Sequence, residues 1–467
     1  MSTDFDLIIR NADVATASDR FQCDIGIVQG KITALGLNLG TAAETIDASG
    51  LLVLPGGIDA HCHLDQPMPH GLRMADDFSS GTRSAACGGT TTVIPFAAQI
   101  KGSSLQAAVD DYHERAAGKA AIDYAFHLIV SDPTPEVLQH ELPRLIEGGY
   151  TSFKIYMTYD DLKLSDHEIL KVLDVARTHD ALVMIHAENS DCITWLTERL
   201  TGQGHTAPKF HASSRPMAVE REATHRAITF SELAGVPILI VHVSGREAIE
   251  QIRWAHGRGL RIHAETCPQY LFLTEQDLDA DGYQGAKCVC SPPPRDKQNQ
   301  DAVWSGLTHN VFSIFSSDHA AFRYDDSHGK KPGGEEQPFQ YIPNGIPGLE
   351  TRLPLLFSGG VAAGRIDIHQ FVALTATNPA KMYGLYPRKG SIMVGADADI
   401  VLWDTKRRVT IDNAMLHHNV DYTPYQGMEV QGWPVLTLSR GRVVSRDSSL
   451  VGDMYGGEFL PCGKPMI

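Results

Sequence analysis

Long apolar runs are missing from this sequence. Although 43% of its 467 residues are hydrophobic, no unbroken stretch reaches the length that crosses a bilayer. We therefore expect a soluble globular protein without a membrane partner. Residues 1–6 carry acidic side chains and lack a basic start followed by an apolar stretch, so we expect no signal peptide.

Basic side chains are also in short supply. Lysine and arginine number 40 against 56 aspartates and glutamates, which gives a net charge of −16. A surface with this charge repels nucleic acid and anionic membranes, so neither is expected as a partner. The net charge leaves open what binds in a buried pocket.

Cysteine pairs of the CxxC type are absent, and the eight cysteines are scattered along the chain. In a chain of this length, that pattern is typical of reduced thiols in a cytoplasmic protein and not of a disulfide framework.

The two ends of the chain share a pattern of short strand-like segments separated by polar turns. These segments are 5–10, 24–28 and 31–35 near the start, and 398–403, 408–411 and 435–439 near the end. Neither set forms a complete domain alone, because each leaves a sheet face and edges uncovered. We predict that the ends pair into one small β-sandwich. The expected parts are residues 1–55 and 391–450 for the sandwich, 56–390 for a separate inserted domain and 451–467 for a C-terminal tail.

The inserted domain alternates strand-like and helix-like segments, which is typical of parallel βα units. Eight strands over about 300 residues favour a closed (β/α)8 TIM barrel over an open sheet. The expected strands are 58–64, 90–96, 123–130, 151–157, 181–188, 237–244, 261–266 and 311–317. The expected helices are 105–117, 135–147, 166–179, 219–233 and 246–256. Residues 319–347 show no regular pattern, and a loop that long in a compact domain is usually functional.

His61 and His63 follow the apolar run 51–55, which indicates a buried strand. Side chains alternate along a strand, so both imidazoles face the same side and could chelate a cation such as zinc. A His-x-His pair alone is a weak signal. Its place near a strand end, where barrel enzymes carry their active sites, strengthens it.

Lys154 lies in the apolar segment 151–157. Lysine is rare in buried strands, because a lone ammonium is costly to desolvate. Lys154 could lie in water at a frayed strand end. Alternatively, burial lowers its pKa, and the neutral amine reacts with carbon dioxide to form a carbamate, whose two oxygens can bridge two cations.

His186, His242 and Asp318 also stand at the ends of expected strands. Each has an ordinary explanation, as a hydrogen-bonded core histidine or as an acid that caps a turn. All lie at the same end of the predicted barrel as the His-x-His pair, which favours one shared site. The histidines interpreted as structural or surface residues are His127, His263, His319, His417 and His418.

Charge balance favours two metal ions at this site. Two divalent ions, a carbamate on Lys154, Asp318 and a hydroxide leave a net charge of about +1. Such a centre holds its ions and stays a strong Lewis acid, whereas an unmodified Lys154 adds repulsion.

Further motifs extend this pattern along the chain. They are Gly57-Ile58-Asp59, His61-Cys62-His63-Leu64-Asp65, Phe153-Lys154, His186-Ala187-Glu188-Asn189, His242-Val243-Ser244, Glu265-Thr266-Cys267-Pro268-Gln269-Tyr270, Ser291-Pro292-Pro293, Ser317-Asp318-His319 and Pro343-Asn344-Gly345-Ile346-Pro347-Gly348. In these motifs the chain resembles, over nearly its whole length, the dihydropyrimidinase and hydantoinase branch of the amidohydrolase superfamily.

The resemblance implies two zinc ions per subunit, bridged by N6-carboxylated Lys154. The implied ligands are His61, His63 and Asp318 for one ion, and His186 and His242 for the other. A hydroxide between the ions would attack a ring amide carbonyl, and Asp318 would pass the hydroxide's proton to the leaving nitrogen.

For the substrate, the resemblance implies that Tyr159 hydrogen-bonds the tetrahedral oxyanion, although a tyrosine that merely packs on a loop fits the sequence equally. Ser291 and Asn344 match positions whose backbone groups bind the –NH–CO– edge of the ring. Every cyclic ureide offers this edge, so the ring is recognised whatever its substituent.

Asp65 narrows the branch, because relatives that open dihydroorotate or allantoin usually carry an arginine there. We expect 5,6-dihydropyrimidines or 5-monosubstituted hydantoins to be opened to N-carbamoyl amino acids. The segment 66–73, Tyr156 and Ala320 depart from the family pattern and leave the preferred ring open. Alternatives are a cyclic imide or allantoin-like hydrolase and, in another class, a non-catalytic assembly protein, which the complete ligand set disfavours. The family habit is a homotetramer to which 451–467 could contribute.

Overall fold

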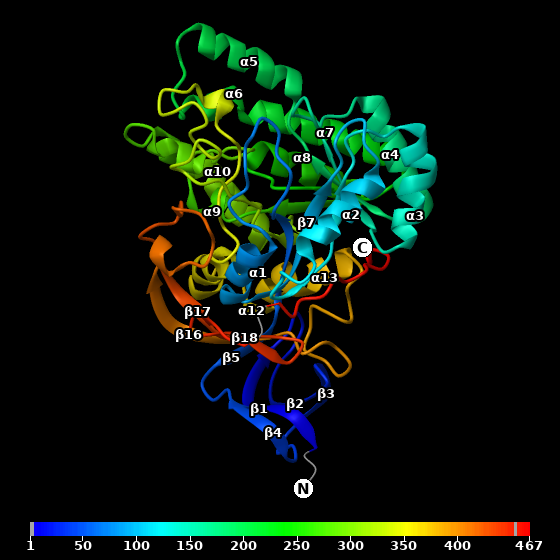
Figure 1. Ribbon diagram of the computed structural model, residues 1–467, viewed down its shortest axis with the longest axis vertical. Coiled ribbons are helices and arrows are strands. Elements are labelled where there is room, and N and C mark those ends of the chain that lie inside the picture. The colour runs from blue at the N-terminus through cyan, green and yellow to red at the C-terminus, as the bar shows by residue number, and fades with distance from the viewer. Residues whose placement is uncertain (1–3, 453–454) are drawn as a thin grey trace.

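The computed structural model describes residues 4–452 and 455–467. Figure 1 shows an upper part of strands surrounded by helices and a lower part built from strands. Within the described residues, no helix is both long and apolar enough to cross a membrane.

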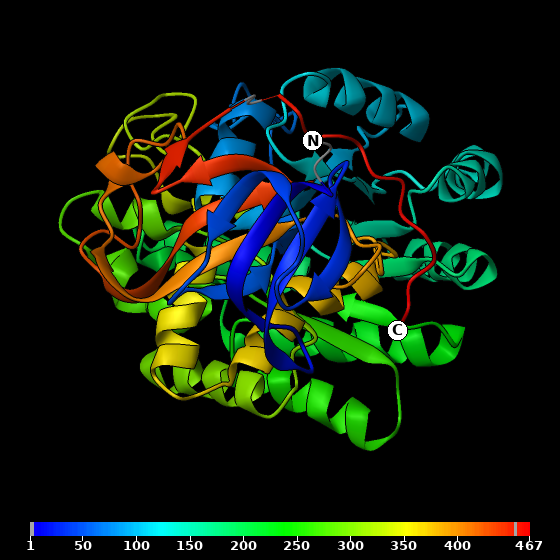
Figure 2. The ribbon, with the colours of Figure 1, turned by 90° about the horizontal axis from the view of Figure 1, so that it is seen from below.

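Strands from both ends of the chain form the lower part. They are β1 (Phe5–Ala15), β2 (Arg20–Val28), β3 (Lys31–Gly36), β4 (Ala42–Asp47), β5 (Leu52–Pro55), β16 (Ile400–Thr410), β17 (Glu429–Ser439), β18 (Arg442–Arg446) and β19 (Ser449–Leu450). The order is β19-β18-β17-β16-β5-β1-β2-β3, and β4 pairs with β1. From below, the blue and orange-red strands lie side by side (Figure 2).

The two ends also share a core, because Ile9, Ile25 and Val53 pack with Ile400 and Leu438. This confirms the prediction of one small β-domain built from both ends. The expected separation of 398–403 from 408–411 was wrong, because β16 runs from Ile400 to Thr410 without a break. Its pairing register with β17 shifts between Leu402 and Trp403 and again between Asp404 and Arg408.

The upper part is a curled parallel sheet. Its strands are β6 (Gly57–His63), β7 (Thr90–Ala98), β8 (Asp123–Tyr124), β9 (His127–Ile129), β10 (Ser152–Tyr156), β11 (Leu182–His186), β12 (Ile238–Ile240), β13 (Ile262–Thr266), β14 (Ile314–Phe315) and β15 (His319–Ala320). β14 pairs with β13, and β15 pairs with β6, so one interrupted strand joins the last strand to the first. The (β/α)8 barrel prediction is confirmed.

Several barrel strands are shorter than the sequence predicts. The expected strand 123–130 is divided into β8 and β9, and 237–244 contains only β12. The chain leaves the extended conformation at His242 (φ 41°), just after β12, and at Asp318 (φ 49°). The turn at Asp318 separates β14 from β15. Apolar composition alone does not reveal these turns.

Helices cover the outside of the barrel. They are α1 (Phe78–Cys87), α2 (Leu105–Ala116), α3 (Leu142–Glu147), α4 (Asp166–His179), α5 (Ser190–Gly202), α6 (Phe210–Ser214), α7 (Met217–Ala234), α8 (Arg246–Gly257), α9 (Gln269–Phe272), α10 (Lys297–Thr308), α11 (Arg352–Leu356), α12 (Ile368–Val372) and α13 (Asn378–Met382). The π-helical segments η1 (Val137–Glu141), η5 (Phe357–Ala362) and η6 (Ala373–Thr377) continue into or from them. Short 3-10 turns are η2 (Glu275–Asp279), η3 (Gln284–Cys288), η4 (Phe339–Tyr341) and η7 (Asn413–Met415).

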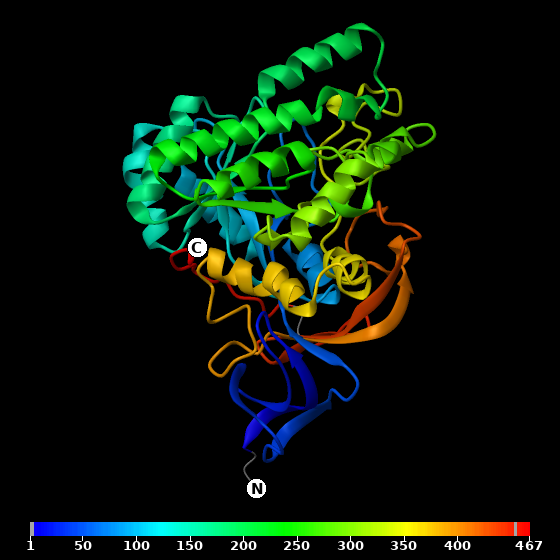
Figure 3. The same cartoon turned by 180° about the vertical axis from the view of Figure 1, so that it is seen from behind.

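Local signals explain where the longer helices begin and end. Ser165 and Glu168 form a capping box at the start of α4, and Asp180 ends the helix in the left-handed conformation. Gly235 ends α7 in the same way. The gold segment α11 to α13 lies between the barrel and the lower sheet (Figure 3).

The described part of the C-terminal tail lies along its own barrel. The backbone N–H of Leu460 donates to the carbonyl of Tyr124 (2.7 Å), and that of Cys462 donates to Gly149 (2.9 Å). Phe459 packs against Tyr124 and Tyr150.

Lys389 fastens the barrel to the strands that follow it. Its ammonium is 1% exposed and lies 2.6 Å from Asp123, 3.0 Å from Asp397 and 2.7 Å from Asp399. Burial raises the pKa of Asp399. Burial also opposes ionisation of Asp397, but Lys389, together with Lys31 and Arg388, brings its pKa down to about 2. The amine therefore neutralises charges that have little access to water.

Replacing this amine should destabilise the fold strongly. In Lys389→Met the three carboxylates lose their common cation, so we expect the free energy of unfolding to fall by about 3–5 kcal/mol. Urea unfolding measures it. Lys31→Met is the matched control, because Lys31 pairs with the same Asp397 from a side chain that is 45% exposed, and it should cost less than about 1 kcal/mol. Equal losses in the two variants would contradict the role given to Lys389.

Candidate active site

Six predicted side chains meet at the carboxyl ends of the barrel strands. His61 and His63 end β6, Lys154 lies in β10, His186 ends β11, His242 follows β12, and Asp318 separates β14 from β15. All are buried. The structure therefore brings together every residue that the sequence suggested as a metal ligand, including Lys154, which is 1% exposed and does not lie in water.

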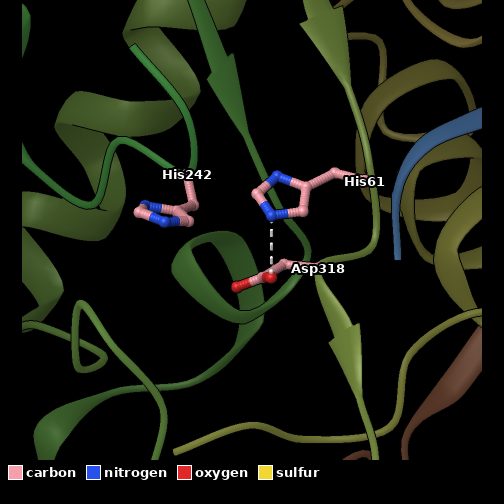
Figure 4. Close-up of side chains that lie close together, drawn as sticks. All are labelled: His61, His242 and Asp318. Atoms are coloured by element: carbon pink, nitrogen blue, oxygen red, sulfur yellow. Dashed lines mark ion pairs between the residues drawn. The ribbon is translucent and has the colours of Figure 1, made fainter. Parts of the chain in front are cut away.

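Their polar atoms form two adjoining groups. In the first, His61 Nε2 lies 3.2 Å from Asp318 Oδ1 and 2.6 Å from Lys154 Nζ, and His63 Nε2 lies 3.5 Å from Asp318 Oδ1. Figure 4 shows the imidazole of His61 pointing at the Asp318 carboxylate, with His242 beside them. In the second, His242 Nε2 lies 2.9 Å from His186 Nδ1.

The opposite nitrogen of three of the rings is held by an oxygen. Glu265 binds His61 Nδ1 at 2.6 Å, Glu188 binds His186 Nε2 at 2.8 Å, and Gln66 binds His63 Nδ1 at 2.6 Å. These contacts turn the free nitrogen toward the centre, as outer partners do in metal sites. None of these three residues was predicted to orient a ligand. A signal was available for two of them: an acid on the apolar strand β13 and another acid two positions after His186.

Burial sets the protonation states. Desolvation lowers the pKa of His61 and His242 well below the usual value and also lowers that of His186. Desolvation lowers the pKa of Lys154 in the same way. Desolvation opposes ionisation of Asp318, but the neighbouring His61, His63 and Lys154 bring its pKa down to about 2.

These are the forms that a metal requires: neutral imidazoles, an amine that loses its proton readily and an ionised carboxylate. Ligand atoms of His61, His242 and Asp318 all lie within 4.8 Å of one another. The donor set of the six residues, nitrogen and oxygen, suits zinc and similar divalent ions. The residues present therefore fit a metal centre.

Strained backbone marks the same place. His242 (φ 41°), Asp318 (φ 49°) and Tyr159 (φ 67°) adopt the left-handed conformation, which side chains rarely favour. Such strain persists only where the surroundings enforce it, and it clusters at functional sites.

The three residues predicted to bind substrate also lie together. Asn344 Nδ2 donates to the Tyr159 hydroxyl at 3.2 Å, and the Ser291 hydroxyl donates to Glu188 at 2.7 Å. Desolvation raises the pKa of Tyr159 to about 12, so its phenol keeps its proton. Because Glu188 also holds His186, the predicted substrate-binding residues adjoin the pair formed by His186 and His242.

Lys330 anchors the loop that carries Asn344. Its buried amine donates to the carbonyls of Val289 (2.8 Å) and Pro343 (2.7 Å). Desolvation lowers its pKa to about 7. The loop 319–347 is thus fixed from inside. Nothing in the sequence separated Lys330 from surface lysines.

His319, directly after Asp318, has a structural partner. Its Nε2 lies 3.0 Å from Asp76, and its Nδ1 accepts from the backbone of Gly348 and Leu349. His127 is held by Ser152 and by a carbonyl. These two histidines lie in hydrogen-bonded core positions, as expected.

Comparisons with known proteins agree with this geometry. The model of the amidohydrolase family matches residues 52–444. A D-hydantoinase from Ralstonia pickettii is 45% identical over 456 residues, which are 97% of this chain and 98% of the relative. The crystal structure of a dihydropyrimidinase from Brevibacillus agri is 44% identical and superposes with a TM-score of 0.95, covering 98% of this chain and 99% of that one.

A structure described as an L-hydantoinase (dihydropyrimidinase) from Arthrobacter aurescens is also similar, at 28% identity and a TM-score of 0.88, covering 97% of this chain and 99% of that one. The matches extend over both the barrel and the small β-domain. This chain therefore belongs to the amidohydrolase family, in its dihydropyrimidinase and hydantoinase branch.

Proposed function

We propose that this protein opens the ring amide of 5,6-dihydropyrimidines, of 5-monosubstituted hydantoins, or of both, and releases N-carbamoyl amino acids. The observation that carries the proposal is the convergence of four imidazoles, Lys154 and Asp318 at one end of the barrel. Relatives named D-hydantoinase and dihydropyrimidinase support the substrate class.

Two zinc ions are the proposed cofactors. The proposed ligands are His61, His63 and Asp318 for one, and His186 and His242 for the other, with carboxylated Lys154 shared between them. Bound there, the ions would lower the pKa of a water molecule and polarise the ring carbonyl.

Lys154 suits the bridging role because its amine is buried and its pKa is lowered. A neutral amine adds to carbon dioxide, releases one proton and gains a negative charge. The nearest ring nitrogen, His61 Nε2, is only 2.6 Å away. An ammonium facing the imidazoles would repel a metal cation, whereas a carbamate attracts it.

Asp318 is the proposed proton carrier. Its carboxylate is ionised and lies among the imidazoles of the first group, so it can accept a proton from the attacking water and pass it to the leaving ring nitrogen. Tyr159 keeps its proton and donates it in a hydrogen bond to the oxyanion that develops on the ring carbonyl. Backbone groups of Ser291 and Asn344 would bind the –NH–CO– edge.

Two alternatives differ in what they predict. A cyclic imide or allantoin-like hydrolase would use the same centre with another substrate ring. The segment 66–73, Tyr156 and Ala320 do not by their chemistry select one ring over another. A non-catalytic assembly protein would need no metal. The buried ligand set, with three of its four imidazoles oriented by an oxygen, favours catalysis.

Other features of the proposal come from the sequence. We propose domain limits at 1–55 and 391–450 for the β-sandwich and 56–390 for the barrel, with a tail at 451–467. A cytoplasmic location and a homotetramer stay predictions.

Ring opening tests the function directly. We expect zinc-loaded protein, expressed with bicarbonate, to open dihydrouracil or a 5-substituted hydantoin. The loss of the substrate's ultraviolet absorbance measures the reaction. Succinimide and allantoin are the comparison substrates. Failure of the first two rings in protein that carries about two metals per subunit would contradict the substrate assignment. Protein that purifies without stoichiometric metal would favour the assembly role.

Lys154→Ala should remove both zinc binding at this site and activity, because the bridge is lost. Short carboxylic acids such as propionate should restore part of the activity by occupying the place of the carbamate. Elemental analysis and turnover measure the two effects. Lys171→Ala, on the exposed face of α4, is the control and should behave like the wild type. Full activity in Lys154→Ala would rule out the bridge.

Asp318→Asn should keep the fold while kcat falls by about 10²–10⁴-fold, since the amide cannot carry the proton. Circular dichroism checks the fold, and turnover of the best ring gives kcat. Asp325→Asn, at an exposed position of the following loop, should leave kcat unchanged. Near-normal turnover by Asp318→Asn would remove it from the mechanism.

A further inference from the structure

Away from the barrel mouth, a second group of metal-ligating side chains lies between the two domains. Cys87 ends α1, Glu350 lies between Gly348 and α11, and His417 follows η7. One ligand atom from each lies within 4.8 Å of the other two. Cys87 is 1% exposed and Glu350 2%, whereas the His417 side chain is 23% exposed. The group is therefore buried but can be reached by solvent at His417.

The three side chains are held in place by their surroundings. His417 Nδ1 lies 3.0 Å from Glu350 Oε1, and the His417 backbone N–H donates to Glu350 Oε2 at 2.8 Å. The Ser84 hydroxyl donates to the same oxygen at 3.1 Å, and Ser445 lies 3.5 Å from the Cys87 sulfur. These contacts orient the carboxylate and the thiol before any ligand binds.

The backbones of the segments that carry Cys87 and Glu350 also lie unusually close together. A Cβ atom on Gly88 would lie 2.3 Å from the carbonyl oxygen of Glu350, so only glycine fits directly after Cys87. The next residue, Gly89, accepts a hydrogen bond from the Gly57 backbone at 3.0 Å. Gly57 begins β6 and His63 ends it. The group thus lies at the opposite end of the strand from the barrel mouth.

We propose that Cys87, Glu350 and His417 form a metal site for a divalent cation that favours sulfur and nitrogen ligands, such as zinc. A thiolate, an imidazole and a carboxylate are all ligands that zinc uses, and a water molecule can complete four-coordination from the exposed side of His417. The proposal does not depend on the proposed function, because none of these residues belongs to the barrel-mouth site.

The charges of the three ligands match a divalent cation. The ion, the Cys87 thiolate, the neutral His417 imidazole and the Glu350 carboxylate would sum to zero charge, which suits a buried cluster. Binding would release the protons that the ligands carry in the metal-free protein.

The site would fasten the small β-domain to the barrel. α1 lies directly above β18 in Figure 1, and the two elements are in contact. Beyond His417 the same loop binds the barrel again, since the Asn419 backbone N–H donates to Asp76 Oδ1 at 2.8 Å and Asp421 accepts from the Tyr324 backbone at 2.7 Å. A bound ion would therefore add a further link between three segments that hydrogen bonds already hold together.

Cobalt substitution tests the site independently of catalysis. Full-length protein loaded with Co²⁺ should show a near-ultraviolet thiolate-to-cobalt charge-transfer band, because no cysteine is among the proposed ligands at the barrel mouth. The band should be present in the wild type and in Lys154→Ala. It should disappear in Cys87→Ser, with a loss of about one metal per subunit by elemental analysis.

Two controls keep the outcome unambiguous. Cys192→Ser removes the exposed cysteine and should retain the band, which excludes binding at a surface thiol. His417→Gln changes the partly exposed ligand, so a folded variant without the band supports the site even if Cys87→Ser is unstable. A wild type without the band, or a Cys87→Ser protein that keeps it, would overturn the proposal. Loss of ring opening with the band intact would instead contradict the proposed function.

Discussion

The hydrogen bond between Glu265 and His61 is the contact on which the geometry of the barrel mouth depends. The same carboxylate oxygen accepts from His61 Nδ1 at 2.6 Å and from the His242 backbone at 3.1 Å, so it joins both groups of the cluster. With one nitrogen committed to Glu265, His61 can only present the other to Lys154 and Asp318. Burial raises the pKa of Glu265, so a carboxylate there is costly by itself. A metal cation bound at the centre of the site, as proposed, would offset that cost.

Glu188 plays the corresponding part on the other side. Its Oε2 accepts from His186, from Arg215 at 2.9 Å and from the Ser291 hydroxyl. Burial alone would raise the pKa of Glu188, but Arg215 and His186 hold it well below the usual range. One carboxylate thus contacts both the His186 ring, which faces the centre, and Ser291, a proposed substrate-binding residue. Under the proposed function, this shared contact would set the position of the ring amide relative to the metal ligands.

The sequence was sufficient for the barrel, the β-domain and the cluster, because each depends on local rules. His-x-His in a strand, Lys154 in an apolar run and Asp318 at a strand end are visible as polar side chains where apolar ones belong. Glu265 followed the same rule, yet its partner is 204 positions away, and one sequence does not show which ring it faces. The early ends of β12 and β14 were missed because backbone turns at positive φ leave no compositional trace. Cys87, Glu350 and His417 were invisible as a group because each is unremarkable in its own segment.

Lys330 has a consequence for how the mouth of the barrel can vary between related proteins. Its buried amine fixes the loop that carries Asn344, and the Phe339 backbone N–H donates to the Thr206 carbonyl at 2.8 Å. Residues 331–338 therefore form a loop segment whose flanking residues, Lys330 and Phe339, are both held by hydrogen bonds. The entropy of closing a loop grows only slowly with its length. This loop segment is accordingly the stretch that evolution, or an engineer who seeks a different ring substituent, can lengthen or rewrite while Asn344 stays in register.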